Sequence, residues 1–121
     1  MAVPIHRHGP YLIASAQAAL SDAELNQLRD DLVERVGRFQ SLGAVLDVSA
    51  MDVMDSFATR MIRNIAQMCR LRGARVVLVG VQPDVAFAMA QLGLTSRLDG
   101  IETAIDLEAG LAALASKEQP P

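Results

Sequence analysis

Three aspartates lie close together near the middle of the chain, and two hydroxyl side chains follow them. Asp47 lies near the end of a short apolar run, Asp52 and Asp55 come shortly after the run, and Ser56 and Thr59 follow them. Carboxylates gathered beyond the end of a strand can coordinate Mg²⁺, because hard oxygen ligands suit that ion. Aspartate and serine ahead of an apolar helical run can instead cap the helix. The cluster therefore has two chemical interpretations, a metal site and a helix start.

The helix start fits the sequence better than the metal site does. A magnesium site of the response-regulator kind needs a lysine after a late strand, whereas the only lysine, Lys117, is near the C-terminus. We therefore expect no metal, and we expect Asp55 or Ser56 to be the N-cap. A helix start also suits a phosphate group, since free amides and the positive end of the helix dipole point toward it.

The remaining reactive side chains do not suggest catalysis. His6 and His8 lie near the N-terminus, where we interpret them as ordinary surface residues, and no catalytic triad can be drawn from them. Neither the P-loop nor the Rossmann type of glycine-rich phosphate loop occurs. Cys69 is on the apolar side of a helical pattern and should be a small core residue. We expect a protein without enzymatic activity or cofactor.

Five short segments favour strands. The first two flank Gly9-Pro10, a pair typical of a turn, and they predict an N-terminal hairpin. The third is apolar except for Asp47, which is typical of a buried strand. The segments are residues 3–5, 11–14, 44–48, 75–80 and a stretch that ends near 104–105.

Four segments favour helices. Ser21 stands three residues before Glu24, the spacing of a capping box, and predicts the start of a helix that Gly43 would stop. Its apolar stripe is Leu25, Leu28, Leu32, Val36 and Phe39. The other helices are expected at 56–72 with Gly73 as a left-handed cap, from Gln82-Pro83 to Gly93, and from 106 to about 115.

The alternation of strands and helices predicts an α/β fold. Crossover connections imply a mixed, mainly parallel sheet with about four helices, and the hairpin would add an antiparallel edge. A length of 121 residues suits one domain, which we place at 1–115. We expect 116–121 to be a disordered tail, because two prolines after polar residues cannot continue a helix.

Composition narrows the choice of partners and compartment. The chain has 11 Lys and Arg against 14 Asp and Glu, a net charge of −3, so a surface that binds nucleic acid is not expected. No apolar stretch is long enough for a membrane helix, and the N-terminus does not resemble a secretion signal. A single cysteine cannot form an internal disulfide, which fits a reducing compartment. We expect a cytoplasmic protein.

The segment 46–59 passes from a strand through an acidic loop into a helix. It reads LDVSAMDVMDSFAT, an aspartate-rich strand end followed by an aspartate-serine pair that opens a helix. In this it resembles the STAS domain family of bacterial anti-sigma-factor antagonists. The stretches RGARVVLVGVQP at 72–83 and IETAIDLEAGL at 101–111 are similar to the RsbS-type antagonists of the stressosome within that family.

The resemblance implies a function that the residues alone do not. It implies a non-enzymatic scaffold that self-associates, assembles with RsbR-type co-antagonists, and sequesters an RsbT-type serine/threonine kinase that regulates stress signalling. The serine that matches the family's phosphoacceptor is Ser56, whose phosphorylation would release the kinase and whose dephosphorylation would need an RsbX-type phosphatase. Phe57 and Ala58 depart from the D-S-S-G form of simpler antagonists, which favours the stressosome type. The alternative is a free-standing antagonist that binds an anti-sigma kinase directly.

The expected partner surface combines the acidic loop with the start of the helix. A phosphate on Ser56 would add about 1.5–2 negative charges beside the aspartates, so a bound partner would meet repulsion. Thr59 is interpreted as a solvated threonine, with a second phosphoacceptor as the alternative, while Met54 could contact a partner or fill the core. The expected surface residues are Asp47, Asp52, Met54, Asp55, Ser56, Thr59 and Arg60.

Overall fold

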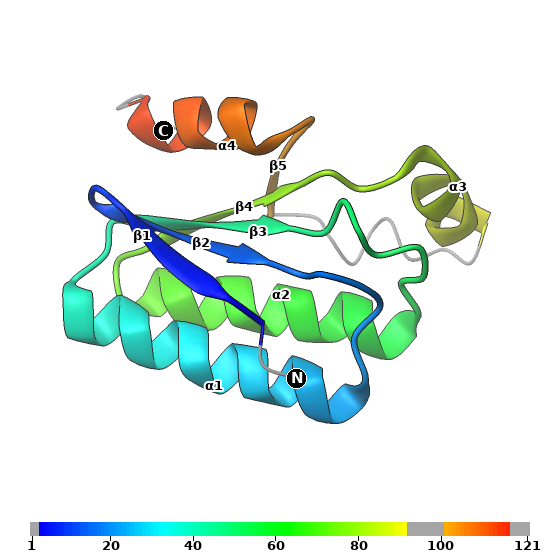
Figure 1. Ribbon diagram of the computed structural model, residues 1–121, viewed down its shortest axis with the longest axis horizontal. Helices are drawn as coiled ribbons and strands as arrows, with labels where there is room; N and C mark the ends of the chain where they lie inside the picture. Colours follow the sequence, from blue (N-terminus) through cyan, green and yellow to red (C-terminus); the bar gives the residue numbers. More distant parts are fainter. Residues whose placement is uncertain (1–2, 92–100, 117–121) are drawn as a thin grey trace.

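The computed structural model describes residues 3–91 and 101–116, which form a five-stranded sheet with four helices (Figure 1). This arrangement confirms the predicted α/β class and the predicted order of elements. The order is β1 (Ile5–His8), β2 (Tyr11–Ser15), α1 (Asp22–Phe39), β3 (Gly43–Asp47), α2 (Ser56–Leu71), β4 (Arg75–Val79), α3 (Pro83–Gln91), β5 (Glu102–Ala104) and α4 (Leu107–Ala115).

The strands lie in the sheet in their order along the chain. β1 pairs antiparallel with β2, and every later pair is parallel, so the hairpin forms the antiparallel edge as predicted. Gly9 in the hairpin turn has a φ of 60°, a left-handed conformation that glycine adopts without strain. The carboxyl ends of β2, β3 and β4 lie side by side, because their last residues are neighbours in register: Ser15, Asp47 and Val79.

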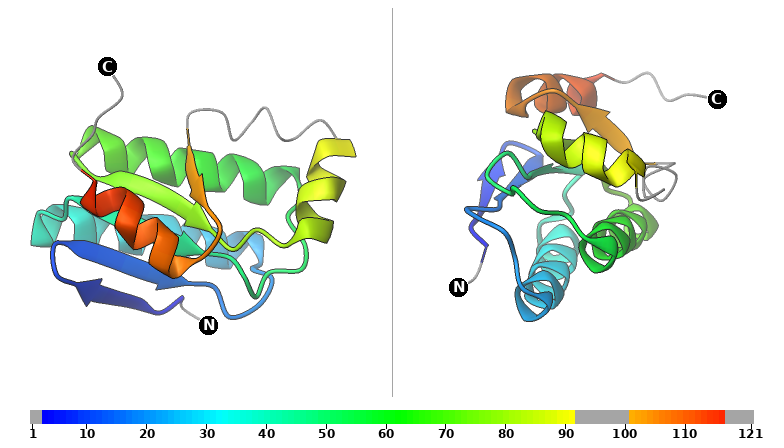
Figure 2. Two further views of the ribbon diagram at one scale, coloured as in Figure 1. Left: turned by 90° about the horizontal axis from the view of Figure 1, so that it is seen from above. Right: turned by 90° about the vertical axis from the view of Figure 1, so that its right-hand side faces the viewer.

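Helices cover both faces of the sheet. α1 and α2 lie side by side against one face, whereas α4 lies on the other (Figures 1 and 2). α3 lies beyond the carboxyl ends of β3 and β4 (Figure 1). The larger core, between the sheet and the α1–α2 layer, includes the fully buried Leu12, Leu25, Leu32, Leu46, Ile62, Ile65 and Leu78.

The start of α1 follows the sequence prediction, but its end does not. The Ser21 hydroxyl accepts a hydrogen bond from the Glu24 amide at 3.1 Å and the Glu24 carboxylate accepts one from the Ser21 amide at 2.9 Å, which confirms the capping box. The helix ends at Phe39, and its C-cap Gln40 takes a left-handed conformation with a φ of 50°. The prediction that Gly43 stops this helix was wrong. Gly43 begins β3, and a β-carbon there would lie 2.7 Å from Leu114 of α4.

The later boundaries are close to those predicted. Gly73 follows α2 with a φ of 88°, and Pro83 is the first residue of α3. Gly93 and residues 117–121 lie outside the described part of the chain. Ser116, predicted as the first residue of the tail, is the C-cap of α4, and its carbonyl accepts a hydrogen bond from Arg75 at 3.3 Å. Within 3–91 and 101–116, no helix has the length and apolar character needed to cross a membrane.

Candidate functional site

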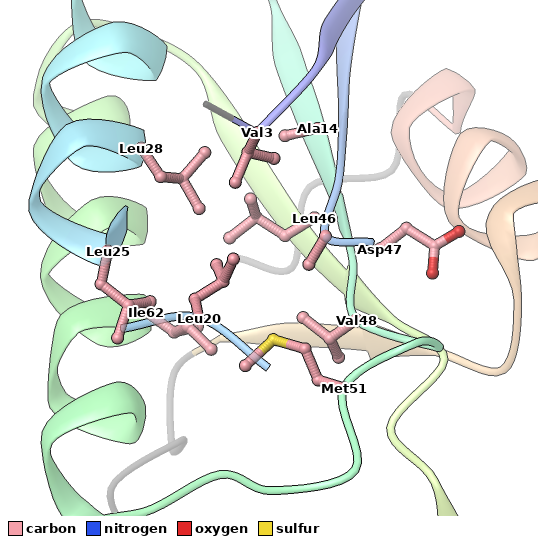
Figure 3. A pocket seen from close by; sticks show the side chains of 11 residues that line it. Val3, Ala14, Leu20, Leu25, Leu28, Leu46, Asp47, Val48, Met51 and Ile62 are labelled. Atoms are coloured by element: carbon pink, nitrogen blue, oxygen red, sulfur yellow. The ribbon is translucent and has the colours of Figure 1, made fainter. Parts of the chain in front are cut away.

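The loop between β3 and α2 begins with a turn that Asp47 forms. The Asp47 carboxylate accepts a hydrogen bond from the Ser49 amide at 2.9 Å, and the Val48 amide donates to the Val79 carbonyl at 3.0 Å. Side chains alternate along a strand, and Leu46 packs in the α1–α2 core. Asp47 therefore points to the opposite face, and Figure 3 shows its carboxylate directed away from the apolar side chains.

The segment after β4 holds the loop from the other side. Gln82 donates a hydrogen bond from its side-chain amide to the Ser49 carbonyl at 2.8 Å. Gly80 has a φ of 79°, and a β-carbon on it would lie 2.8 Å from the Ser49 β-carbon. The close approach of these two segments requires glycine at this position. Neither contact is predictable from the local sequence, since only the pairing of β3 with β4 brings the segments together.

Two methionines attach the loop to the core. Met51 and Met54 are only 2% and 6% exposed. Figure 3 shows Met51 beside Val48, facing Leu20 and Ile62 across a small apolar cavity of about 10 Å³. A cavity of that size has room for one water molecule at most. The expectation that Met54 belongs to the partner surface was therefore wrong, because its flexible thioether side chain fills the interior.

Asp55 is the residue that caps α2. Its carboxylate accepts a hydrogen bond from the Ala58 amide at 2.8 Å. Its carbonyl accepts two more, from the Thr59 amide at 3.0 Å and from the Thr59 hydroxyl at 2.9 Å. Thr59 is fully buried. The prediction of a solvated, partner-binding Thr59 was wrong, because its hydroxyl finds an acceptor inside the first turn of the helix and burial leaves no polar atom unpaired.

Ser56, by contrast, is exposed at the first position of α2. In the described part of the chain its hydroxyl makes no hydrogen bond, and the Ser56 and Phe57 amides also lack acceptors. Amides at a helix start point outward along the axis and attract anions. Ser56 thus combines an accessible hydroxyl with donors that can solvate a negative group bound to it.

The structure brings together only part of the predicted surface. Asp52, Asp55, Ser56 and Arg60 are exposed in the loop and on the first turns of α2, whereas Asp47 is half-buried on the other side of the sheet. Val53 was not predicted, although 59% of it is exposed between Asp52 and the cap. An apolar residue inside a polar loop was the signal for it in the sequence.

The described residues contain neither a cluster of metal-ligating side chains nor a reactive thiol. Over residues 3–91 and 101–116, no group of three or more His, Cys, Asp or Glu side chains is placed to hold a metal ion. Cys69 is fully buried, as predicted, and burial raises the pKa of its thiol to about 11. Since the thiolate is the reactive form, Cys69 is unreactive near neutral pH.

Comparison with known proteins identifies the family. The model of the STAS domain matches residues 2–107. The chain belongs to the STAS domain family. This confirms the resemblance seen in residues 46–59, which lie within the matched range. The mixed sheet with helices on both faces is the structure of a single STAS domain.

Two solved structures with clear sequence similarity to this STAS domain are stressosome proteins. RsbS of Moorella thermoacetica, in a serine-to-glutamate variant, is 32% identical over 93% of both chains, with a TM-score of 0.77. The second is a chain from a structure of the stressosome, which is described as a signal integration and transduction hub. It is 31% identical to this chain, and the match covers 92% of this chain and 95% of the stressosome chain, with a TM-score of 0.70.

A third structure shares the fold at low identity. The anti-sigma factor antagonist SpoIIAA in its unphosphorylated form is 12% identical over 93% of this chain and 96% of its own, with a TM-score of 0.68. A search of curated proteins found no match to this sequence.

Proposed function

We propose that this STAS domain is a non-enzymatic stressosome antagonist of the RsbS type. In this proposal it sequesters an RsbT-type serine/threonine kinase in the cytoplasm and releases the kinase when Ser56 is phosphorylated. It would assemble with copies of itself and with RsbR-type co-antagonists, and an RsbX-type phosphatase would reset Ser56. The observation that carries the proposal is the exposed Ser56 hydroxyl, which has no hydrogen-bond partner in the described chain and stands at a helix start.

The relatives support a serine-based switch. The M. thermoacetica RsbS structure is of a variant in which a glutamate replaces a serine, and the SpoIIAA structure is described as the unphosphorylated form. Both descriptions concern a serine or a phosphorylation state. Because the chain is similar to RsbS over 93% of its length, we carry this chemistry to Ser56.

The geometry around Ser56 supports release by surface charge. Phosphate at the start of α2 would meet the free amides of the first turn, so the helix need not unfold. The new charge would stand beside the exposed carboxylates of Asp52 and Asp55. A kinase packed on this surface would then face several negative charges that it must desolvate or repel. Because Asp47 points to the opposite face, we leave it out of the proposed surface.

The proposal is tested by mapping the phosphorylated residue. Incubation with an RsbT-type kinase and ATP should label Ser56 in the wild-type protein. Ser56→Ala should abolish the label and retain the bound kinase, since the charge that drives release cannot be added. Ser49→Ala is the matched control, because Ser49 is also exposed in the loop but does not start the helix. A label found mainly on Ser49 or on the buried Thr59 would contradict the proposal.

A further inference from the structure

The exposed side of α2 carries positive charge along its length. We define the arginine stripe as four exposed residues on this side of the helix: Arg60, Arg63, Gln67 and Arg70. Counting from Ser56, they follow at intervals of four, three, four and three residues. A helix turns once in about 3.6 residues, so Ser56 and the stripe share one face, which is about 21 Å long. Ser56 stands at the N-terminal end of this face.

The arginine stripe has no acidic partner in the described part of the chain. α2 itself contains no aspartate or glutamate. None of the three arginine side chains forms an ion pair or a hydrogen bond with residues 3–91 or 101–116. Among the described residues, the arginines that form ion pairs belong to other elements: Arg29 with Asp30, Arg38 with Glu34, and Arg75 with Glu102.

The stability of the helix does not explain where these arginines are. Cations stabilise a helix near its C-terminal end, so the dipole accounts for Arg70 alone. Arg60 and Arg63 lie in the N-terminal half of α2 and are three residues apart, a spacing at which like charges repel. The whole chain has a net charge of −3, so a generally basic composition does not account for them either. Repulsion between Arg60 and Arg63 that no contact within the described chain offsets is typical of a functional surface.

Exposed apolar side chains flank the stripe. Val53 is 59% exposed before the cap of α2, Met68 is 39% exposed beside the stripe, and Leu71 is 89% exposed at its C-terminal end. Arginine and methionine are enriched in protein interfaces, whereas aspartate and glutamate are depleted from them. The combination on α2 has this composition. It therefore points to a protein partner, and the unpaired guanidinium groups favour a partner surface that carries carboxylates.

We propose that the arginine stripe docks an acidic surface of the kinase that phosphorylates Ser56. This inference rests on the proposed function and adds the contact by which the kinase recognises its substrate. Guanidinium groups bind carboxylates through pairs of parallel hydrogen bonds, so a row of them fixes orientation as well as attracting charge. A kinase seated along α2 has Ser56 at the end of its contact surface. A second copy of this chain docked on the same face would compete with the kinase for access to Ser56.

The experiment compares two double variants that each remove two positive charges. Arg63→Gln with Arg70→Gln changes the stripe and leaves Ser56 and Arg60 intact. Arg29→Gln with Arg38→Gln is the matched control on α1, which lies beside α2 in the same layer. Calorimetry measures the kinase Kd at several ionic strengths, initial rates give kcat and KM for Ser56 phosphorylation, and thermal melts verify folding.

The stripe variant should raise Kd and KM about tenfold, the loss expected for two exposed or partly exposed charge pairs, while kcat is retained. Its binding should also depend less on ionic strength than that of the wild type. The control variant should bind within about twofold of the wild type. Unchanged binding of the stripe variant, an equal loss in the control, or a change in self-association alone would overturn the inference. Absence of kinase binding by the wild-type protein would overturn the proposed function as well.

Discussion

At the scale of single residues, Ser56 and Thr59 differ in accessibility although only one helical turn separates them. Ser56 is exposed, whereas Thr59 is fully buried and donates its hydroxyl hydrogen bond to the Asp55 carbonyl. A spacing of three residues is compatible with one shared helical face, and the sequence analysis interpreted Thr59 as solvated. The rotation of α2 against α1 and the sheet decides which hydroxyl faces solvent, and that rotation depends on packing that the local sequence does not contain. The proposal of Ser56 as phosphoacceptor comes from family resemblance, whereas the burial of its neighbour Thr59 could not be inferred from the sequence.

The accessibility of Ser56 leads to a prediction for Ser56→Asp. The added carboxylate lies at the positive end of the α2 dipole, so the free energy of unfolding should be unchanged or higher by about 0.3–1 kcal/mol. The kinase Kd should nevertheless rise, because the same charge faces the bound partner. Calorimetric binding and a thermal melt on the same sample measure the two quantities separately.

The matched control for this substitution is Ser56→Asn. Asparagine removes the hydroxyl and has a similar size to aspartate, but it adds no charge. Its Kd for the kinase should stay near that of the wild type, which assigns the loss in Ser56→Asp to charge. A Ser56→Asp protein that melts several degrees lower, or that binds as tightly as the wild type, would be evidence against a surface switch.

At the scale of elements, the regular structure was predictable and the loop was not. Periodic apolar residues, the Ser21 capping box and glycine or proline at element ends gave the order of strands and helices, because those signals are local. The loop before α2 has no such period. Its shape depends on Met51 and Met54 turning inward and on the contact of Gly80 with Ser49, which arise only after β3 and β4 are paired.

The cap of α2 leads to a prediction for Asp55. Asp55→Ala removes the carboxylate that accepts from the Ala58 amide, and it should lower the free energy of unfolding by about 1 kcal/mol. Asp55→Asn should retain most of the stability, since its amide oxygen can accept the same hydrogen bond. Denaturant unfolding of the two variants provides the measurement. If asparagine proved as destabilising as alanine, the charge of Asp55 rather than its hydrogen bond would hold the helix start.

At the scale of the whole molecule, the candidate site is confined to one end. The carboxyl ends of β2, β3 and β4, the acidic loop and the start of α2 all lie near α3 (Figures 1 and 2). The opposite end of the sheet, the edge strand β1 and the outer side of α4 are separate from Ser56. A domain built in this way can contact neighbouring domains through those surfaces while the start of α2 stays accessible to an enzyme.

This separation predicts that assembly and phosphorylation are compatible. Co-expression with an RsbR-type co-antagonist should give a large particle by light scattering, as expected for a chain 31% identical to one from the stressosome. Ser56 within that particle should still be labelled by the kinase, because the surfaces proposed for assembly leave the start of α2 uncovered. Ser56→Ala, which changes no buried contact, should assemble as the wild type does and take up no label. If only small species formed at every ratio and salt concentration, the free-standing antagonist would become the better explanation. If particles formed but Ser56 could not be labelled, the start of α2 would itself be an assembly contact.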